Sequence, residues 1–268
     1  MLERERQSLI LKLVNERSIV SVIDLVALLG ASEATIRRDV NALAERGELR
    51  RIRGGAEAIR PRLEAHLVGM PFSLSRDVHA SEKRAIARAA AALIEAGESI
   101  IISGGTTTFA LAEFLVDQEL DILTSSFPLA ESLLATSRNR ITLPGGQIFR
   151  EQNIVLSPFP NDGISHFWGR KMFTGCFGIN PFGLMEADPL IVMSQARLLE
   201  RAEQVVVLAD GSKLGQRSAM VVAGIERVSV VVTDESAARA DIDALEARGV
   251  KVIVAQVPSE AGLENVGT

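Results

Sequence analysis

Apolar residues in the first part of the chain recur every three to four positions. One such run covers residues 6–16, and a shorter one covers residues 22–29 and stops at Gly30. This spacing predicts two amphipathic helices, because residues three and four apart lie on the same helix face. Two short helices joined by a tight Gly-containing turn are typical of a helix-turn-helix unit.

A third helix is predicted to begin at Ser32, a residue type that caps the free amides of a first helical turn, and to end at Gly47. Its buried stripe consists of Ile36, Val40 and Leu43. The polar side chains that point away from this stripe are those of Thr35, Arg37, Arg38 and Asn41. Arginine and asparagine bind phosphates and base edges, so we expect this helix, with Ser32 at its start, to contact DNA.

The segment after Gly47 changes to a period of two. Leu49 and Ile52 alternate with arginines, and two glycines at 54 and 55 supply a turn, which predicts a two-stranded wing. Arg51 and Arg53 of the wing are further candidates for DNA contact. A solvated helix face beside a polar loop is the alternative interpretation, and the helices that precede the arginines favour the winged helix-turn-helix.

Beyond residue 80, short apolar runs alternate with helical patterns. Strands are predicted at residues 99–102, 120–124, 140–143, 204–209, 228–233 and 250–254. Helices are predicted from residue 81 and near residues 107–116, 127–136, 189–202 and 235–248. This alternation is typical of an α/β domain with a largely parallel sheet. The expected organisation is a DNA-binding domain (1–58), a linker (59–80), an α/β domain (81–257) and a tail (258–268).

Three predicted strands end in loops with the chemistry of a phosphate site. The first loop contains Gly104, Gly105, Thr106, Thr107 and Thr108. Its glycines let backbone amides approach an anion, its threonines donate hydrogen bonds, and a following helix start favours negative charge. A tight turn with a threonine cap is the alternative interpretation of this loop.

The other two strand ends carry Gly145 and Gly146, and Asp210 and Lys213. The carboxylate and the ammonium suit sugar hydroxyls and a phosphate, and a surface salt bridge between them is the alternative. Ligands of parallel α/β sheets bind beyond the carboxyl ends of the strands, which is where these loops lie.

Composition sets the limits of these interpretations. The chain has 268 residues, 47% of them hydrophobic and 24% charged, which suits two folded domains. The net charge is −5, yet residues 1–60 carry 11 basic and 9 acidic side chains. The basic character is therefore local to the predicted DNA-binding elements, where binding depends on salt.

Other site classes find little support. One cysteine, Cys176, excludes an intramolecular disulfide, and three scattered histidines lack a metal-ligand spacing, so neither metal nor cofactor is expected. A signal-peptide core and an apolar run long enough to span a bilayer are also missing, so we expect a cytoplasmic protein without membrane contact.

These motifs together resemble the DeoR-type repressors of bacterial sugar operons. The DNA-binding domain (1–58), called the head below, carries the family's Ser-x-x-Thr-Ile-Arg-Arg-Asp helix and Gly-Gly-Ala wing. It departs from the family pattern at Arg53, where many members have histidine. Lys83, Gly-Thr-Thr, Pro-Gly-Gly and Asp-x-Ser-Lys resemble the sensor domain. The resemblance implies a fold similar to ribose-5-phosphate isomerase, glucosamine-phosphate deaminase and coenzyme A transferases. It also implies that Lys83, the Gly-Thr-Thr loop and Lys213 hold a phosphate while Asp210 binds a hydroxyl.

The resemblance leaves enzyme and sensor to be separated by chemistry. Sugar-phosphate isomerisation needs a carboxylate base, and residues 173–179 lack the acidic segment that the isomerases carry. Glu186 and Asp188 lie close together in the sequence, but a solvated helix start explains them equally well. Cys176 is interpreted as a small buried residue, and no catalytic residue is expected. Two alternatives stay open: an isomerase with a DNA-binding appendage, and a constitutive DNA-binding protein whose second domain oligomerises.

The expected partners are operator DNA and a phosphorylated sugar effector. A two-fold operator requires two heads, which predicts a homodimer or homotetramer. Short segments at 145–147, 156–158, 172–174 and 183–188 resemble the family members that regulate L-ascorbate utilisation. That resemblance implies an effector similar to L-ascorbate 6-phosphate.

Overall fold

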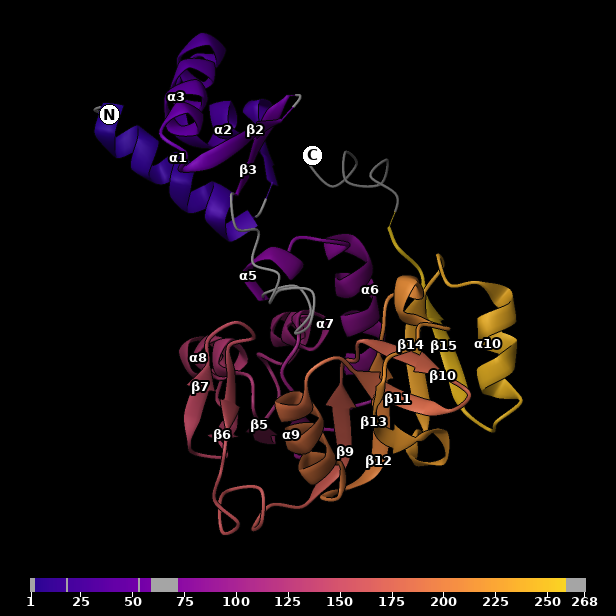
Figure 1. Cartoon of the computed structure of the whole chain (residues 1–268). Helices are drawn as coiled ribbons and strands as arrows, with labels where there is room; N and C mark the ends of the chain where they lie inside the picture. Colours follow the sequence, from indigo (N-terminus) through magenta and orange to yellow (C-terminus); the bar gives the residue numbers. More distant parts are fainter. Residues whose placement is uncertain (1–2, 18, 53, 59–71, 259–268) are drawn as a thin grey trace, which may run out of the picture. The chain divides into compact units, whose positions relative to one another are not determined.

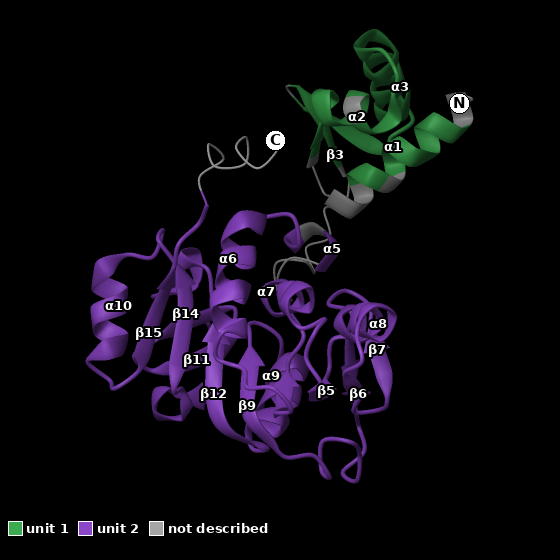
Figure 2. Ribbon diagram, turned by 180° about the vertical axis from the view of Figure 1, so that it is seen from behind, with its two compact units in different colours: residues 1–67 green, residues 68–268 purple. Residues whose placement is uncertain are grey.

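The computed structural model describes residues 3–17, 19–52, 54–58 and 72–258. Contacts divide the chain into two compact units, residues 1–67 and residues 68–268 (Figure 2). This division falls inside the segment predicted as a linker. Arg53, a predicted DNA contact, lies outside the described residues, as do the first part of that linker and nearly all of the predicted tail.

The first unit is a small helical domain with a three-stranded sheet. Its elements are α1 (Glu3–Arg17), β1 (Ile19–Ser21), α2 (Val22–Leu29), α3 (Glu33–Glu45), β2 (Leu49–Ile52) and β3 (Gly55–Ala58). Ile36, Val40 and Leu43 of α3 are buried in the core of this unit, as predicted. Strands β2 and β3 form the predicted antiparallel wing. The structure adds β1, which pairs with β3 and is too short to show a period of two in the sequence.

A buried ion pair joins α3 to α1. Asp39 of α3 is 2% exposed, and its Oδ2 atom accepts a hydrogen bond of 2.5 Å from Nε of Arg6. Its Oδ1 atom accepts another, of 3.2 Å, from Nε2 of Gln7. Asp39 therefore fixes how α3 packs, although it directly follows the two arginines predicted to contact DNA.

The second unit is an α/β domain. Its helices are α5 (Phe72–Ser75), α6 (Ala80–Ala91), α7 (Thr106–Phe109), α8 (Phe127–Thr136), α9 (Pro189–Leu199) and α10 (Arg239–Glu246), with 3-10 turns η1 (Ala110–Phe114), η2 (Gly211–Lys213) and η3 (Ile225–Arg227). Its strands are β4 (Ser99–Ile102), β5 (Asp121–Thr124), β6 (Arg140–Thr142), β7 (Gln147–Phe149), β8 (Ile154–Leu156), β9 (Gly169–Thr174), β10 (Gly178–Asn180), β11 (Gly183–Glu186), β12 (Ala202–Leu208), β13 (Met220–Gly224), β14 (Val230–Asp234) and β15 (Lys251–Ala255).

Seven of these strands form one parallel sheet, in the order β15-β14-β12-β9-β4-β5-β6 (Figure 1). The six strands predicted from the sequence are all present in it. The central strand, β9, was not predicted, because it carries charged residues where a buried strand is expected to be apolar. One of these, Lys171, is buried and forms an ion pair of 2.6 Å with Glu98, which makes its position inside the sheet possible.

Helices cover both faces of this sheet. Alternate residues of β4 point to opposite faces: Ile100 and Ile102 pack in one core with α6, η1 and α8, and Ile101 packs in a second core with α9 and α10. Burial on both faces explains why the strands are continuous apolar runs. The fold class predicted from the sequence, an α/β domain preceded by a small winged helix-turn-helix domain, is thus confirmed.

Two smaller sheets flank the parallel one. Strands β10, β11 and β13 form an antiparallel sheet, and β7 and β8 form a hairpin. The sequence did not predict these strands, most of which have only three or four residues. The antiparallel sheet changes the interpretation of Glu186, because this residue ends a buried strand and does not begin a solvated helix.

Loss of the Asp39 carboxylate is expected to loosen the first unit. The variant Asp39→Ala leaves Arg6 without its buried partner, which costs about 3 kcal/mol, whereas Asp39→Asn keeps acceptor capacity for Gln7 and costs less. Hydrogen exchange of the full-length protein should show faster exchange in α1 and α3, with α6 and β12 unaffected. Equal protection of α3 in the wild type and in Asp39→Ala would contradict this role.

Candidate functional site

The exposed face of α3 presents the predicted DNA-contacting side chains. Ser32 precedes the helix, and its Oγ atom accepts a hydrogen bond of 3.3 Å from the backbone amide of Thr35, so its predicted role as the N-cap is confirmed. Arg37 and Arg38 are both exposed, and Asn41 is half-buried. Arg37 forms an ion pair of 2.6 Å with Glu33 one turn earlier, whereas Arg38 has no ion pair within the described residues.

The wing presents a second cation beside this helix in the first unit. Arg51 of β2 is exposed and forms no ion pair in the described part of the chain, while its neighbour Arg50 pairs with Glu57 of β3 at 3.3 Å. Arg38 and Arg51 therefore have guanidinium groups that are available to phosphates or bases without the loss of an internal ion pair. This arrangement favours them over Arg37 as DNA contacts.

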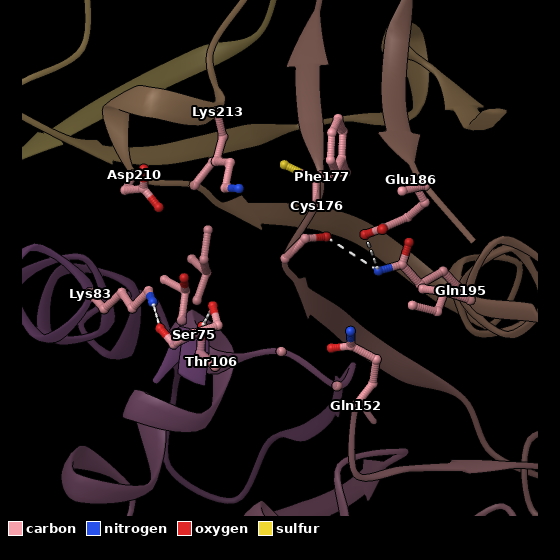
Figure 3. Close-up of a pocket in the computed structure, with 18 of the residues that line it drawn as sticks. Ser75, Lys83, Thr106, Gln152, Cys176, Phe177, Glu186, Gln195, Asp210 and Lys213 are labelled. Atoms are coloured by element: carbon pink, nitrogen blue, oxygen red, sulfur yellow. Dashed lines mark hydrogen bonds between the residues drawn. The ribbon is translucent and has the colours of Figure 1, made fainter. Parts of the chain in front are cut away.

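The second unit contains a cavity of about 270 Å³ at the carboxyl ends of its central strands. Loops after β4, β9 and β12 line it, together with the end of β11, α9, the start of α6, the end of α5 and the β7–β8 turn. Figure 3 shows Lys83, Thr106 and Asp210 on one side of this cavity and Glu186 and Gln195 on the other. The cavity therefore has two ends of different chemistry.

The glycine loop after β4 forms part of the cavity wall. A Cβ atom at Gly104 would lie 2.0 Å from Cγ2 of Ile154, so only glycine fits against the β7–β8 hairpin. The amide of Gly104 donates a hydrogen bond of 3.1 Å to Oγ of Ser125. Gly104, Gly105, Thr106 and Thr107 line the cavity. Thr108 does not, because its buried hydroxyl donates to the carbonyl oxygens of Ser103 and Gly105.

The helix that follows this loop is shorter than predicted. Residues 107–116 were expected to form one helix, but α7 has a single turn and continues as η1. A helix dipole this small contributes little to anion binding, because the effect depends on several aligned peptide units. Nearby cationic side chains are therefore expected to supply most of the positive charge for an anion in this cavity, in addition to the backbone amides of the loop.

Two lysines supply that positive charge. Lys83 of α6 is 5% exposed, and its ammonium donates a hydrogen bond to the carbonyl oxygen of Ser75. Lys213 of η2 places its Nζ atom 5.6 Å from the centre of the Phe177 ring. Neither lysine forms an ion pair with a described residue. Burial lowers the pKa of Lys83, and the negative charge of Asp210 partly opposes this effect.

Asp210 is held as an acceptor at the same end of the cavity. It is 5% exposed, and its Oδ1 atom accepts hydrogen bonds from the amide and the hydroxyl of Ser212. The alternative interpretation of Asp210 and Lys213 as a surface salt bridge is wrong, since the two side chains form no ion pair. Both instead line the cavity.

Gly145 and Gly146 do not join this site. They lie between β6 and β7, and neither lines the cavity. Both have positive φ angles, of 84° and 122°, and a Cβ at Gly146 would lie 2.2 Å from the carbonyl oxygen of Leu156. The structure therefore gives these glycines a backbone role beside β8.

The far end of the cavity holds side chains that the sequence did not assign to it. Glu186 is buried at the end of β11, and burial raises its pKa to about 7. Gln195 of α9 donates from Nε2 to Oε1 of Glu186 and to the carbonyl oxygen of Gly175, each at 3.3 Å. Asp188 caps α9 by accepting from the amides of Leu190 and Ile191.

Cys176 also lines the cavity but has no nucleophilic character. Burial and the nearby Glu186 raise the pKa of its thiol, so the thiolate is not populated at neutral pH. The described residues contain no group of histidine, cysteine and carboxylate side chains able to hold a metal ion, and no helix there is long and apolar enough to cross a membrane.

Comparison with known proteins identifies the family. Residues 6–62 match the family model described as the DeoR-like helix-turn-helix domain, and residues 78–235 match the DeoR C terminal sensor domain. The chain belongs to the DeoR family. The resemblance seen in the recognition helix, the wing and the sensor motifs is thus confirmed, and the chain is a transcriptional regulator of the helix-turn-helix type.

Its relatives include proteins named HTH-type transcriptional regulator UlaR. The one from Shigella sonnei is 35% identical over 256 residues, which cover 94% of this chain and 99% of the relative. The one from Escherichia coli (strain SMS-3-5 / SECEC) is 34% identical with the same coverage.

Solved structures show partial likeness. Ribose 5 phosphate isomerase A from Neisseria gonorrhoeae has a TM-score of 0.35 and 17% identity, over 49% of this chain and 52% of the isomerase. A transcriptional regulator from Streptococcus pneumoniae TIGR4 has a TM-score of 0.39 and 13% identity, over 62% of this chain and 86% of that regulator.

Removal of the exposed arginines of α3 is expected to weaken DNA binding. We expect Arg38→Ala to cost about 1 to 3 kcal/mol if this residue contacts a base edge, and the double variant Arg37→Ala/Arg38→Ala to cost at least as much. Fluorescence anisotropy with DNA selected by the wild type from a random pool measures this. Arg239→Ala on α10 removes the same charge elsewhere and should bind normally. Undiminished binding by the double variant would show that α3 does not contact the DNA.

Proposed function

We propose that the chain is a repressor of a carbohydrate-utilisation operon, and that a phosphorylated sugar or sugar acid relieves its binding to operator DNA. The observation that supports this most is the pair of lysines, Lys83 and Lys213, which line one cavity without an ion-pair partner among the described residues. A phosphate group would give both ammonium groups a direct ion-pair partner, and charge-assisted hydrogen bonds to phosphate are among the strong ones.

The rest of the site fits the same class of ligand. Gly104 and Gly105 keep the wall free of side chains near the lysines, and Asp210 offers a carboxylate to a sugar hydroxyl. A cavity of about 270 Å³ suits a small metabolite, since pockets for drug-sized ligands are mostly larger. L-Ascorbate 6-phosphate is one candidate, proposed from the likeness to the regulators named UlaR. We propose that the protein acts as a homodimer or homotetramer, because a two-fold operator needs two heads. We also propose that it acts in the cytoplasm.

We infer that Lys83 carries the signal out of the cavity. Lys83 donates a hydrogen bond to the backbone carbonyl of Ser75, the last residue of α5. In the sequence, α5 is the first described element after residues 59–71, which follow the DNA-binding head. The other end of α5 is held by the Phe72 ring, which packs edge-on against Phe109 at 5.6 Å. A phosphate that attracts the Lys83 ammonium competes with Ser75. Ligand binding then biases the position of α5, which gives the differential affinity that any allosteric effect needs.

The phosphate site is expected to control release of DNA without touching the head. We predict that Lys213→Ala and Asp210→Ala bind operator DNA within about twofold of the wild type but no longer respond to effector, with a lost coupling of about 1 to 3 kcal/mol. Operator affinity should be measured with and without D-ribose 5-phosphate, D-fructose 6-phosphate and L-ascorbate 6-phosphate.

The control for this measurement is Lys251→Ala, which removes an exposed lysine at the opposite end of the sheet from the cavity. It should respond as the wild type does. Loss of operator binding in Lys213→Ala and Asp210→Ala would show that these residues are structural, and a normal response would place the effector elsewhere.

One observation favours a second candidate, a sugar-phosphate isomerase. Glu186 is a buried carboxyl with a pKa near 7 that faces the cavity, which is the property of a general base. The relatives are named as regulators, and the catalytically silent sensor remains our proposal. We therefore expect the pure protein to leave the three sugar phosphates unchanged by NMR. Turnover that disappears in Glu186→Gln and persists in Asp188→Asn would instead establish the enzyme.

A further inference from the structure

The cavity has a polar end that the phosphate site does not use. Glu186 and Gln195 lie across the cavity from Lys83 and Asp210 (Figure 3), and both are less than one-tenth exposed. Polar side chains buried in the wall of a cavity are expected to be hydrogen-bonded, because an unpaired buried polar atom is unfavourable.

One atom at this end lacks a partner. Nε2 of Gln195 faces two acceptors, Oε1 of Glu186 and the carbonyl oxygen of Gly175, and this sets the orientation of the amide. The other amide atom, Oε1, is buried and accepts no hydrogen bond within the described residues. This oxygen is closed off from the cavity as well as from solvent, so Gln195 acts here by holding Glu186, whose carboxyl lines the cavity and is the group that can meet a ligand oxygen.

We propose that Glu186 and Gln195 form a second subsite, which binds the oxygen-bearing end of the effector that lies farthest from its phosphate. The inference rests on the proposed function, because it takes the phosphate to be held by the two lysines. The ligand class that fits both ends is a small phosphorylated polyhydroxy compound. Simple phosphates and phosphorylated alkyl chains would fill only one end.

The negative charge of the bound phosphate favours the protonated form of Glu186 in this subsite. Entry of a phosphate brings negative charge into the cavity and displaces water, and both effects favour a neutral carboxyl. Burial already raises the pKa of Glu186 to about 7 in the free protein. The carboxyl is therefore protonated in the complex, with a proton taken from solvent, and donates a hydrogen bond to a ligand oxygen.

Other groups in the cavity titrate or carry charge as well. The charged or titratable residues around Glu186 and across the cavity from it are Cys176, Asp188, Asp210, Lys213, Lys83 and His79. The phosphate itself has a pKa near 6. The contribution of Glu186 to the pH dependence of binding is measured by dividing the affinity of the wild type by that of Glu186→Gln at each pH. The other groups titrate in both proteins, so their effects cancel in this ratio.

The sign of the pH effect follows from the pKa. Binding that requires protonated Glu186 is complete below pH 7 and weakens above it, by about tenfold at pH 8 if the pKa of the free protein is near 7. Glu186→Gln is neutral at every pH and can still donate a hydrogen bond, so it escapes this loss. We expect the affinity of the wild type relative to Glu186→Gln to fall about tenfold between pH 6 and pH 8.

Isothermal titration of the full-length protein tests this with two kinds of probe. Inorganic phosphate reports on the lysine end alone, and the best binder among D-ribose 5-phosphate, D-fructose 6-phosphate and L-ascorbate 6-phosphate reports on both ends. Glu186→Ala and Gln195→Ala should weaken the sugar phosphate about tenfold each and leave inorganic phosphate within twofold. Glu200→Gln, an exposed acid at the end of α9, is the control and should change neither.

The outcomes separate the two proposals. A ratio of wild type to Glu186→Gln that does not change with pH, or sugar-phosphate binding that is normal in Glu186→Ala and Gln195→Ala, overturns the second subsite and leaves the phosphate site standing. If the wild type binds neither inorganic phosphate nor any of the three sugar phosphates, the proposed function is wrong, and the second subsite is wrong with it. Glu186→Gln keeps the shape of the side chain and is expected to fold. The pH measurement can therefore still be made if Glu186→Ala does not fold.

Discussion

The parallel alignment of β4, β9 and β12 is the constraint on which the rest of the second unit depends. Parallel strands end at the same edge of a sheet, so the three loops that follow these strands meet there although they lie far apart in the sequence. The middle strand of the three is held by an unusual contact. Lys171 is buried in β9 and is compensated by Glu98, which precedes β4, so this pair fixes two adjacent strands of the sheet.

Charge is compensated differently at the two ends of these strands. The Lys171–Glu98 pair is closed and structural, whereas Lys83 and Lys213 line the cavity without an ion pair among the described residues. The same contrast appears in the first unit, where Asp39 and Arg6 form a buried pair and Arg38 and Arg51 form none in the described part. Lys83, Lys213, Arg38 and Arg51 are cations without an ion pair that we propose to bind effector or DNA, whereas the pairs of Lys171 and Arg6 join neighbouring elements.

The sequence predicted most of the architecture because its signals are local. Helical spacing defined the stripe of α3, and apolar runs defined six strands of the main sheet. The signals failed where long-range contacts decide the structure. The charge of Lys171 in β9 is compensated by Glu98, which lies far from it in the sequence, and Glu186 is acidic near a helix start yet ends a buried strand.

The sequence predicted part of the candidate site and missed the rest. Residues 104–107, Asp210 and Lys213 meet at one cavity, as their positions after two strands of the parallel sheet predicted, and Lys83 of α6 joins them, as the family resemblance implied. Thr108, Gly145 and Gly146 lie outside it, because glycine and threonine serve turns and buried hydroxyl contacts as readily as ligands. Gln195 has no sequence signal at all, since only the tertiary fold brings α9 against the end of β11.

Regulation of the kind proposed requires that the cavity and the DNA-binding head are coupled. Coupling is reciprocal, so an effector that weakens operator binding by some factor must itself bind more weakly, by the same factor, when operator DNA is bound. The direct measurement is the Kd of the best-binding sugar phosphate for the free protein and for the protein saturated with operator DNA. We expect the Kd to be higher by a factor of about 5 to 150 in the DNA complex. An unchanged Kd would show that the cavity does not control the head.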